Sequence, residues 1–416
     1  METPGRFTRR QFLWRASATA IAIPTLAQIL AACGSDDSSG TGGSERINLS
    51  QSNPQPLPTY DDNPSIEGGL SPEAGPLRLI TFADYVPAKL LKDFEREFGV
   101  KVEIVTFSSP DEGLRKVASG EVKFDIYNGL IENLPPVVEG KLIRPVNHDY
   151  LPNLSNIWPS LQDPWYDPGS MYTIGSVVGA FGIGWRTDMV DIDVANLANP
   201  WDAMWDPAVK GMVGFYDQFR EALAFSLFHN GEKDINTPSD EALSAAVDGL
   251  KSLVKDNGAR ITPDAGFAGI GEGTFGVTQS FQGDAQYAAY SMPKGSDPSV
   301  MRWAWPPSNT DGAVGGTISA DFWMVGSQAE SPVLAHEFIN WVLGTEQATT
   351  WYAATGYQLP QNALTAEKVL SLGLVPDYLE SQILTSEAFA QGVWVLPLSE
   401  GDQQRLVDAW TEVQRG

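Results

Sequence analysis

The sequence is poor in cysteine, histidine and positive charge. Its one cysteine, Cys33, allows no internal disulfide, and its three histidines lack the clustered spacing of a zinc site. Lysine and arginine together number 27 against 52 aspartates and glutamates, which gives a formal net charge of −25. A chain this acidic repels nucleic-acid backbones and anionic membranes. We therefore expect no structural zinc, no other metal, no cofactor and no nucleic-acid partner.

The sequence also lacks the short motifs of common catalytic sites. It contains no P-loop GxxxxGK[ST], no nucleophile elbow GxSxG and no zinc-protease HExxH. Thirteen tryptophans and many acids would suit a secreted carbohydrate-active enzyme, whose two carboxylates stand about 5–9 Å apart. That spacing is a matter of three dimensions, so this enzyme is kept as the alternative from a different class. The prediction is that the chain is not an enzyme.

Residues 1–32 have the pattern of an export signal. The pair Arg9 and Arg10 precedes an apolar run from Ala16 to Ala32, which Pro24 interrupts. The run is shorter than the ~20 residues that a transmembrane helix needs. The arginine pair resembles the twin-arginine (Tat) signal, and the ending Leu-Ala-Ala-Cys resembles the lipobox of bacterial lipoproteins, whose cysteine is acylated. We therefore expect a signal peptide over residues 1–32 and a lipid on Cys33.

Residues 33–75 are predicted to be the acylated cysteine and a flexible tether. This stretch is rich in Gly, Ser, Asp, Asn and Pro and has few apolar residues. The folded body is then expected to begin near Pro76. The protein would be extracytoplasmic, in the periplasm or at the cell surface, and held to the membrane by its lipid anchor alone.

From Pro76 onward the sequence alternates predicted strands and helices. Strands are expected at 77–82, 100–107 and 124–127, with a helix after Pro87 and another from Asp111. Such a βαβαβ order forms a parallel sheet and places ligands beyond the carboxyl ends of the strands. Those ends are residues 82–85, 107–109 and 127–132. A second α/β unit is indicated by a capped helix that starts at 237–240 and stops at Gly258.

An ordered series of short stretches in this body resembles the bacterial spermidine/putrescine-binding proteins of ABC transporters, which are extracellular solute-binding proteins. The stretches are residues 79–87, 98–102, 124–126, 179–184, 201–205, 281–284, 321–323 and 356–362. The resemblance covers about residues 77–365. It implies an α/β, two-lobe periplasmic binding protein-like fold (type II), whose lobes are joined by crossing strands. Lobe 1 would be 76–180 plus 320–367, and lobe 2 would be 181–319 plus 368–416.

The resemblance also implies a set of ligand-binding residues. Carried over position by position, the family's contacts fall on Phe82, Asp84, Tyr85, Glu132, Glu221, Phe281, Asp321 and Tyr357. Phenylalanine replaces the usual tryptophan at 82 and 281, and Leu130 and Glu132 replace a serine and a tyrosine. Gln218, with Asp217 beside it, stands where the family has a second acid, and Ser319 stands where it has a tryptophan.

The function implied is capture of a small cation. In this interpretation carboxylates bind the ammonium groups of a polyamine such as spermidine or putrescine, and aromatic rings line its methylene chain. The lobes would close on the ligand by a hinge. We expect a monomer that delivers its ligand to the permease subunits of an ABC importer. The departures at Leu130, Gln218 and Ser319 leave open a different small solute on the same fold.

Overall fold

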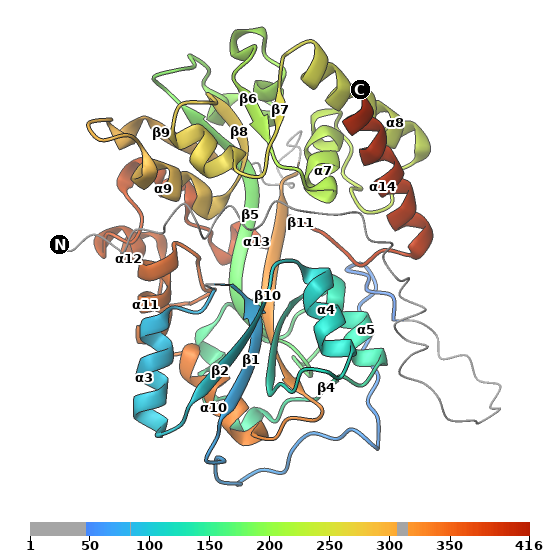
Figure 1. Cartoon of the computed structure of the whole chain (residues 1–416), viewed down its shortest axis with the longest axis vertical. Coiled ribbons are helices and arrows are strands. Elements are labelled where there is room, and N and C mark those ends of the chain that lie inside the picture. The colour runs from blue at the N-terminus through green and yellow to red at the C-terminus, as the bar shows by residue number, and fades with distance from the viewer. Residues whose placement is uncertain (1–46, 84, 306–314) are drawn as a thin grey trace. The chain divides into compact units, whose positions relative to one another are not determined.

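The computed structural model describes residues 47–83, 85–305 and 315–416, and these divide into two compact units (Figure 1). Unit 1 comprises the described residues up to Val177 together with Ala320–Thr355 and Leu359–Asn362. Unit 2 comprises Val178–Ser319, Gly356–Gln358 and Ala363–Gly416. The chain passes between the units within β5 (Ile174–Arg186) and β10 (Thr317–Gly326), which are therefore crossing strands.

The sheet of unit 1 is built on the predicted βαβαβ opening. Its strand order is β2-β1-β3-β10, in which β10 is antiparallel to β3 and the others are parallel. The bounds are β1 Leu77–Phe82, β2 Val102–Phe107, β3 Ile126–Leu130 and β4 Ile143–Arg144, the last paired with β10. Because β1 and β3 are parallel, their carboxyl ends meet at one edge of the sheet.

Helices cover both sides of these strands. Figure 1 shows α3 on one side, and α4 and α5 on the other. Leu90 and Phe94 bury one face of α3, and Gly99 ends that helix in a left-handed conformation with φ 70°. Ser109 caps α4 by accepting the backbone N–H of Glu112. The bounds in unit 1 are α3 Ala88–Phe98, α4 Pro110–Ala118, α5 Leu134–Glu139, α6 Pro159–Gln162, α10 Pro332–Val342 and α11 Thr345–Thr355.

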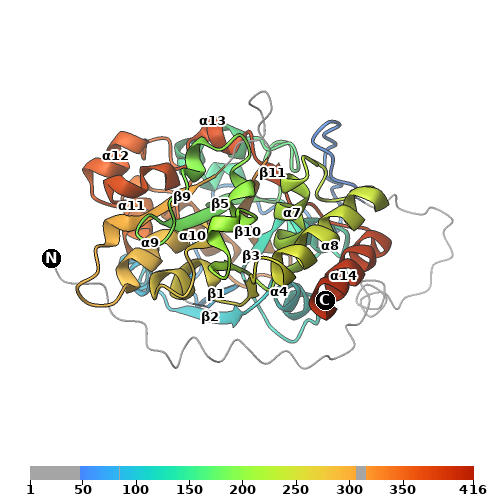
Figure 2. The ribbon, with the colours of Figure 1, turned by 90° about the horizontal axis from the view of Figure 1, so that it is seen from above.

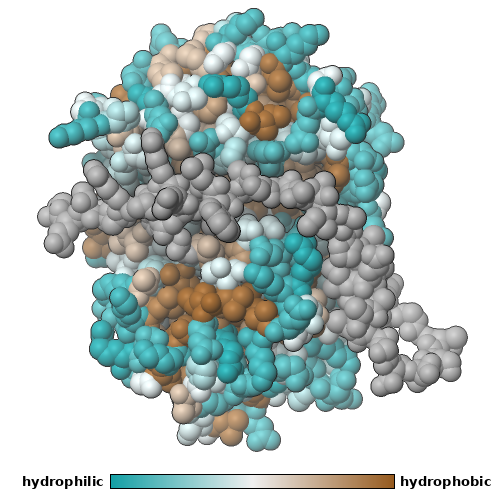
Figure 3. All heavy atoms as spheres, viewed as in Figure 1, coloured by the Kyte–Doolittle hydropathy of each residue, from teal (hydrophilic) through white to brown (hydrophobic). Residues whose placement is uncertain are grey.

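Strand β2 forms an edge of the unit 1 sheet. Among the described residues it pairs with β1 alone, and Ile104 within it is 38% exposed. Figure 3 shows apolar surface over this strand. Lys101 directly precedes the strand and Glu103 lies within it, and such charges are a common protection of an exposed edge against pairing with other chains.

Residues 47–75, drawn in blue in Figure 1, are not the free tether that the composition predicts. They pack on unit 1 without regular secondary structure, and we call them the N-terminal strap. Leu57 is only 5% exposed, and the buried Asn63 side chain donates to the Ile143 carbonyl at 2.8 Å. Near the end of the strap, Glu73 accepts the backbone N–H groups of Val333 and Leu334 at the start of α10. The folded body therefore begins well before Pro76.

Unit 2 contains the other strands of the same sheet, and these run in mixed directions. Its strand order is β5-β8-β6-β7, with β8 antiparallel to β5 and parallel to β6. The strand bounds are β6 Val213–Phe215, β7 Arg260–Ile261, β8 Val277–Phe281, β9 Met301–Ala304 and β11 Val393–Trp394. The helix bounds are α7 Phe219–His229, α8 Asp240–Lys255, α9 Gln282–Ser291, α12 Ala366–Ser371, α13 Ser386–Phe389 and α14 Glu400–Arg415.

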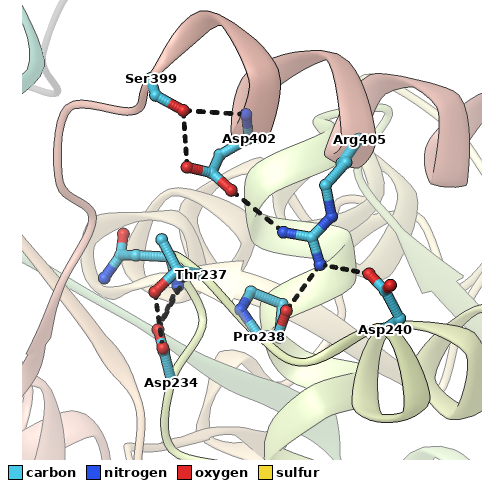
Figure 4. A network of polar contacts seen from close by, with 8 residues as sticks. Asp234, Thr237, Pro238, Asp240, Ser399, Asp402 and Arg405 are labelled. Atoms are coloured by element: carbon cyan, nitrogen blue, oxygen red, sulfur yellow. Dashed lines mark hydrogen bonds and ion pairs between the residues drawn. The ribbon is translucent and has the colours of Figure 1, made fainter.

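A polar network joins the last helix, α14, to the start of α8. Ser239, within the capped start predicted at 237–240, caps α8 by accepting the backbone N–H of Ala242. The Arg405 guanidinium donates to Asp402 on its own helix, to the Pro238 carbonyl and to Asp240 (Figure 4). Figure 2 shows α14 and α8 side by side. The carboxyl-terminal helix is thus an integral part of unit 2.

Candidate functional site

The predicted ligand-binding residues are distributed over both units. Phe82, Tyr85, Glu132 and Asp321 belong to unit 1. Glu221, Phe281 and Tyr357 belong to unit 2, although Tyr357 was expected in lobe 1. Asp84 and the predicted lipidation site Cys33 lie outside the described residues. The two units are therefore treated one at a time.

Asp321 is the centre of the candidate site in unit 1. It stands on β10 directly opposite Leu130, the last residue of β3, and so at the edge where β1 and β3 end. The hydroxyl of Tyr85, in the loop after β1, donates a short hydrogen bond to Asp321 Oδ2. Burial raises the pKa of Asp321 to about 7, and the hydrogen bond from Tyr85 acts in the opposite direction. A cation bound beside this carboxylate would favour its charged form.

A buried polar chain lies behind Tyr85. The Tyr85 hydroxyl lies 3.2 Å from Ser176 Oγ. The Asn128 amide donates to the Phe322 carbonyl at 3.3 Å and lies 3.5 Å from the same Ser176 Oγ, while Thr81 donates to Asn128 Oδ1. These contacts fix the hydroxyl that holds Asp321. Sequence reasoning missed Ser176, Asn128 and Thr81, because they meet only through the pairing of distant strands.

Aromatic rings surround Tyr85. Its ring lies 5.4 Å from Trp351, 6.3 Å from Trp323 and 6.0 Å from Phe82, measured between centroids. Trp351 and Trp323 are buried, whereas Phe82 at the end of β1 is half-buried. Glu132 follows β3 in the 3-10 turn Ile131–Asn133 and is also half-buried. Phe82 and Tyr85 therefore provide the aromatic part of this site.

In unit 2 the predicted acid Glu221 lies in the first turn of α7, the helix that follows β6. Burial raises the pKa of this half-buried carboxyl, and its own backbone N–H and the charge of Arg220 act the other way. Its backbone carbonyl accepts the Gln279 side chain of β8 at 2.8 Å. This bond ties the start of α7 to the neighbouring strand and sets the position of Glu221.

A second acid of unit 2, Asp284, was not among the predicted ligand contacts. It lies in the first turn of α9, directly after β8. Its Oδ2 accepts the Tyr216 hydroxyl at 2.6 Å and the Phe281 backbone N–H at 2.8 Å. Burial raises its pKa to about 6 against these two hydrogen bonds. Asp284 directly follows β8, a strand that pairs in parallel with β6, and this position is the signal that could have identified it.

Three aromatic rings form a triangle beside Asp284. Phe281 lies 4.2 Å from Phe181 and 5.9 Å from Tyr216, and Phe181 lies 5.9 Å from Tyr216. Tyr357, 45% exposed, lies over the start of α9, where a Cβ atom on Gly283 would stand 3.6 Å from its ring. The predicted wall residues Phe281 and Tyr357 thus lie close to the same helix turn. The sequence did not indicate that Phe181 and Tyr216 would join them.

Two buried acids elsewhere show what a purely structural carboxylate looks like in this chain. Asp125 accepts the Ser331 N–H on one oxygen and the Arg78 N–H on the other. Asp167 accepts donors on both oxygens from residues 171–173. Within the described ranges, Asp321 and Asp284 accept hydrogen bonds on Oδ2 only. Asp321 and Asp284 thus differ from the two structural acids, whose two oxygens both accept hydrogen bonds.

Asp217, the acid next to Gln218, is hydrogen-bonded within unit 2. Asp217 accepts the Trp410 indole N–H at 3.2 Å and the Gln414 amide at 2.9 Å, both on α14. Among the described residues no salt bridge reaches Asp321, Glu221 or Asp284. Asp217 thus holds α14.

The described part of the chain contains no group of three or more His, Cys, Asp and Glu side chains arranged to hold a metal ion. In the same residues we find no helix with the length and hydropathy of a membrane span. The candidate site thus consists of carboxylates, hydroxyls and aromatic rings.

Comparison with known proteins gives one family. The sequence profile described as bacterial extracellular solute-binding protein matches residues 89–369, more than half of the chain. The spermidine/putrescine-binding periplasmic protein of Escherichia coli K12 is 26% identical over 76% of this chain and 86% of its own length. The putrescine/cadaverine-binding protein of Pseudomonas aeruginosa is 22% identical over 81% of this chain and 93% of its own.

Solved structures agree on the fold. The spermidine/putrescine ABC transporter substrate-binding protein PotD of Streptococcus pneumoniae superposes with a TM-score of 0.65, at 21% identity, over 82% of this chain and 98% of that one. The Tp0655 (TpPotD) lipoprotein of Treponema pallidum gives 0.65 at 18% identity, over 81% and 98%. The predicted α/β, two-lobe periplasmic binding protein-like fold is confirmed, and the chain belongs to the bacterial extracellular solute-binding proteins.

Proposed function

We propose that this protein captures a small organic cation of the polyamine class outside the cytoplasm and delivers it to an ABC importer. The observation that carries the proposal is a set of half-buried acids. Asp321 of unit 1 lies on β10 opposite the last residue of β3, and Glu221 and Asp284 of unit 2 lie in helix turns that follow strands. The related proteins named for spermidine, putrescine and cadaverine point to the same class.

The surroundings of these acids suit a polyamine. Opposite unit charges about 4 Å apart attract by ~4 kcal/mol at an effective dielectric constant of ~20. An aromatic ring beside an ammonium group adds ~0.5–2 kcal/mol. Tyr85 contacts Asp321 and has Phe82 beside it, while Phe281 and Tyr357 lie near Asp284. Each unit thus offers a carboxylate for an ammonium group and rings for a methylene chain.

The remaining roles rest on the resemblance. Asp84 and Glu132 are proposed as further acidic contacts in unit 1. Cys33 is proposed as the lipid attachment that keeps the protein at the membrane, after export through the signal at residues 1–32. Binding without catalysis, closure of the lobes on the ligand and action as a monomer belong to the same proposal.

A ligand screen tests the proposal. Mature protein carrying Cys33→Ser is heated with spermidine, putrescine or cadaverine, and with uncharged sugars and amino acids as controls. A ligand at 100 times its dissociation constant stabilises the fold by about 2.7 kcal/mol. We expect at least one polyamine to raise the melting temperature, and the sugars to leave it unchanged. If no polyamine does so while another solute does, the cation assignment is wrong.

A further inference from the structure

Three buried glutamines of unit 2 form a hydrogen-bonded cluster. Gln282, Gln358 and Gln382 are 4%, 1% and 1% exposed. The Gln282 amide donates to Gln358 Oε1 at 2.9 Å and to the Gln382 carbonyl, and the Gln382 amide donates to the Gln282 carbonyl. Buried amides are costly unless they are paired, so these bonds constrain the geometry of the glutamine cluster. Gln382 Oε1 is buried without a hydrogen-bond partner among the described residues.

The cluster ties three distant segments together. Gln282 begins α9, Gln358 lies in the short passage Gly356–Gln358, and Gln382 lies near the carboxyl terminus. The Gln358 amide also donates to the Leu384 carbonyl at 2.7 Å, and the Leu384 N–H donates back to Gln358 Oε1 at 3.0 Å. The Gln358 carbonyl accepts the Val178 N–H of β5 at 2.8 Å. Both the side chain and the backbone of Gln358 are therefore fixed.

Residues of the proposed site are the immediate chain neighbours of this cluster. Phe281 precedes Gln282, and Tyr357 precedes Gln358. Tyr357 is preceded by Gly356, whose φ of 74° suits glycine, so this passage has a special backbone conformation. Because the Tyr357 ring is 45% exposed, its placement over Gly283 depends strongly on the backbone that carries it.

We propose that the glutamine cluster is a positioning device that holds Tyr357 against the first turn of α9, in the place where it meets the ligand. The role in binding rests on the proposed function. Gln382 and Leu384 lie beyond residue 369, where the family match ends. A segment outside the matched region would thus help to shape the site.

A Tyr357 ring that is already held in its binding position loses less conformational entropy when the ligand binds. Immobilising one side chain on binding corresponds to about a two- to tenfold change in affinity. Gln358→Met keeps the side-chain volume similar and removes its three hydrogen bonds. We therefore expect it to weaken polyamine binding by about two- to tenfold.

Gln286→Met is the matched control. Gln286 is buried on the same helix, and its amide donates to the Leu374 carbonyl of the same carboxyl-terminal region at 2.8 Å. It has no hydrogen bond with the cluster within the described residues. Its replacement should lower stability to a similar degree while leaving affinity unchanged. Gln382→Met provides a second test if Gln358→Met does not fold.

The positioning role is measured first without ligand. In protein labelled with 3-fluorotyrosine, the Tyr357 fluorine resonance, assigned with Tyr357→Phe, should shift or broaden in Gln358→Met and stay unchanged in Gln286→Met. An unchanged resonance in both Gln358→Met and Gln382→Met would overturn the proposal. This readout stands even if the wild type binds no polyamine, an outcome that would remove the proposed function alone.

Calorimetry then tests the link to binding. In a Tyr357→Ala background, Gln358→Met should cause no further loss of affinity, because the cluster acts through Tyr357. An equal loss with and without the Tyr357 ring would show a general structural effect and would contradict the positioning role.

Discussion

The two units hold their acids in different ways. Asp321 of unit 1 stands on a strand and accepts one hydrogen bond, from Tyr85, and its pKa is raised to about 7. Asp284 of unit 2 stands in the first turn of a helix and accepts two, one of them from a backbone N–H, and its pKa is raised only to about 6. A helix start and its N–H groups favour a carboxylate, and a strand offers no such help.

This difference has a consequence for binding. The raised pKa of Asp321 lies nearer neutrality than that of Asp284, so Asp321 holds its proton to a higher pH. Under the proposed function, a cation that binds beside Asp321 favours loss of that proton. Binding in unit 1 should then depend on pH more than binding in unit 2.

The largest expected effect concerns a part that unit 1 has and unit 2 lacks, the N-terminal strap. Leu57→Ala removes a side chain that is 5% exposed, and such changes cost about 2–5 kcal/mol of folding free energy. Denaturation should show that loss in unit 1, and hydrogen exchange should leave α9 of unit 2 unaffected. A tether that does not pack would show no loss at all.

The second largest expected effect is the loss of polyamine affinity when one carboxylate charge is removed. Asp321→Asn in unit 1 and Glu221→Gln in unit 2 should each weaken polyamine binding by ~1.5–3 kcal/mol, about ten- to a hundredfold. Neither should lower the stability of the ligand-free protein. Asp167→Asn is the control, because it breaks a saturated structural carboxylate and should lower stability instead. Calorimetry that finds unchanged affinity in both site variants would remove these residues from the site.

Asp284→Asn should behave differently from Asp321→Asn. Its Oδ2 also accepts the Phe281 N–H and the Tyr216 hydroxyl, so the change should lower stability by about 0.5–1.5 kcal/mol as well as affinity. Thermal unfolding of both ligand-free variants measures the contrast. If Asp284→Asn and Asp321→Asn were equally stable, the hydrogen bonds of Asp284 at the helix start would not explain the difference between the two acids.

A smaller effect is expected in the pH dependence of stability and of polyamine affinity, which should distinguish Asp321 of unit 1 from the acids of unit 2. The folded pKa of Asp321, about 7, lies above its ordinary value of 3.8, so the folded chain holds this proton longer than the unfolded chain. The Asp321 contribution to ligand-free stability should therefore fall as pH rises from about 4 to about 7. Polyamine affinity should rise over pH 6–8 in the wild type and be flatter in Asp321→Asn. An identical pH profile for the variant would refute the assignment.

The smallest effect is expected from Tyr85→Phe. It removes a hydrogen bond that favours the charged form of Asp321, so the pKa of Asp321 should rise further and the affinity profile should move to higher pH. The loss of one such bond is worth ~0.5–1.5 kcal/mol. Calorimetry at several pH values checks the shift, and a move to lower pH would contradict the role given to Tyr85.

Local patterns predicted the parts of the fold that depend on local rules. The strands and helices at 77–127 and the Ser239 cap follow from alternation, turns and capping, and the structure confirms them. The strap was missed because its composition is polar, and its order comes from a few contacts such as those of Leu57 and Asn63. Composition does not show which of its residues find partners.

In the candidate site, too, the residues that follow strands could be predicted, and those brought in by distant parts of the chain could not. The rule that ligands lie beyond the carboxyl ends of strands leads to Tyr85 and to the turn that contains Asp284. Ser176 and Tyr216 were missed because long-range pairing brings them there. Tyr357 was assigned to the wrong unit because only three residues, Gly356–Gln358, leave unit 1 at that point.

The central claim is that the protein binds a polyamine and that Asp321 of unit 1 and Glu221 of unit 2 each contribute to that binding. Isothermal titration of the mature protein with spermidine and putrescine at pH 8, repeated with Asp321→Asn and Glu221→Gln, tests it most directly. The account predicts one ligand per chain for the wild type and a ten- to hundredfold weaker affinity in each variant. No binding of either polyamine by the wild type, or wild-type affinity in both variants, would contradict it.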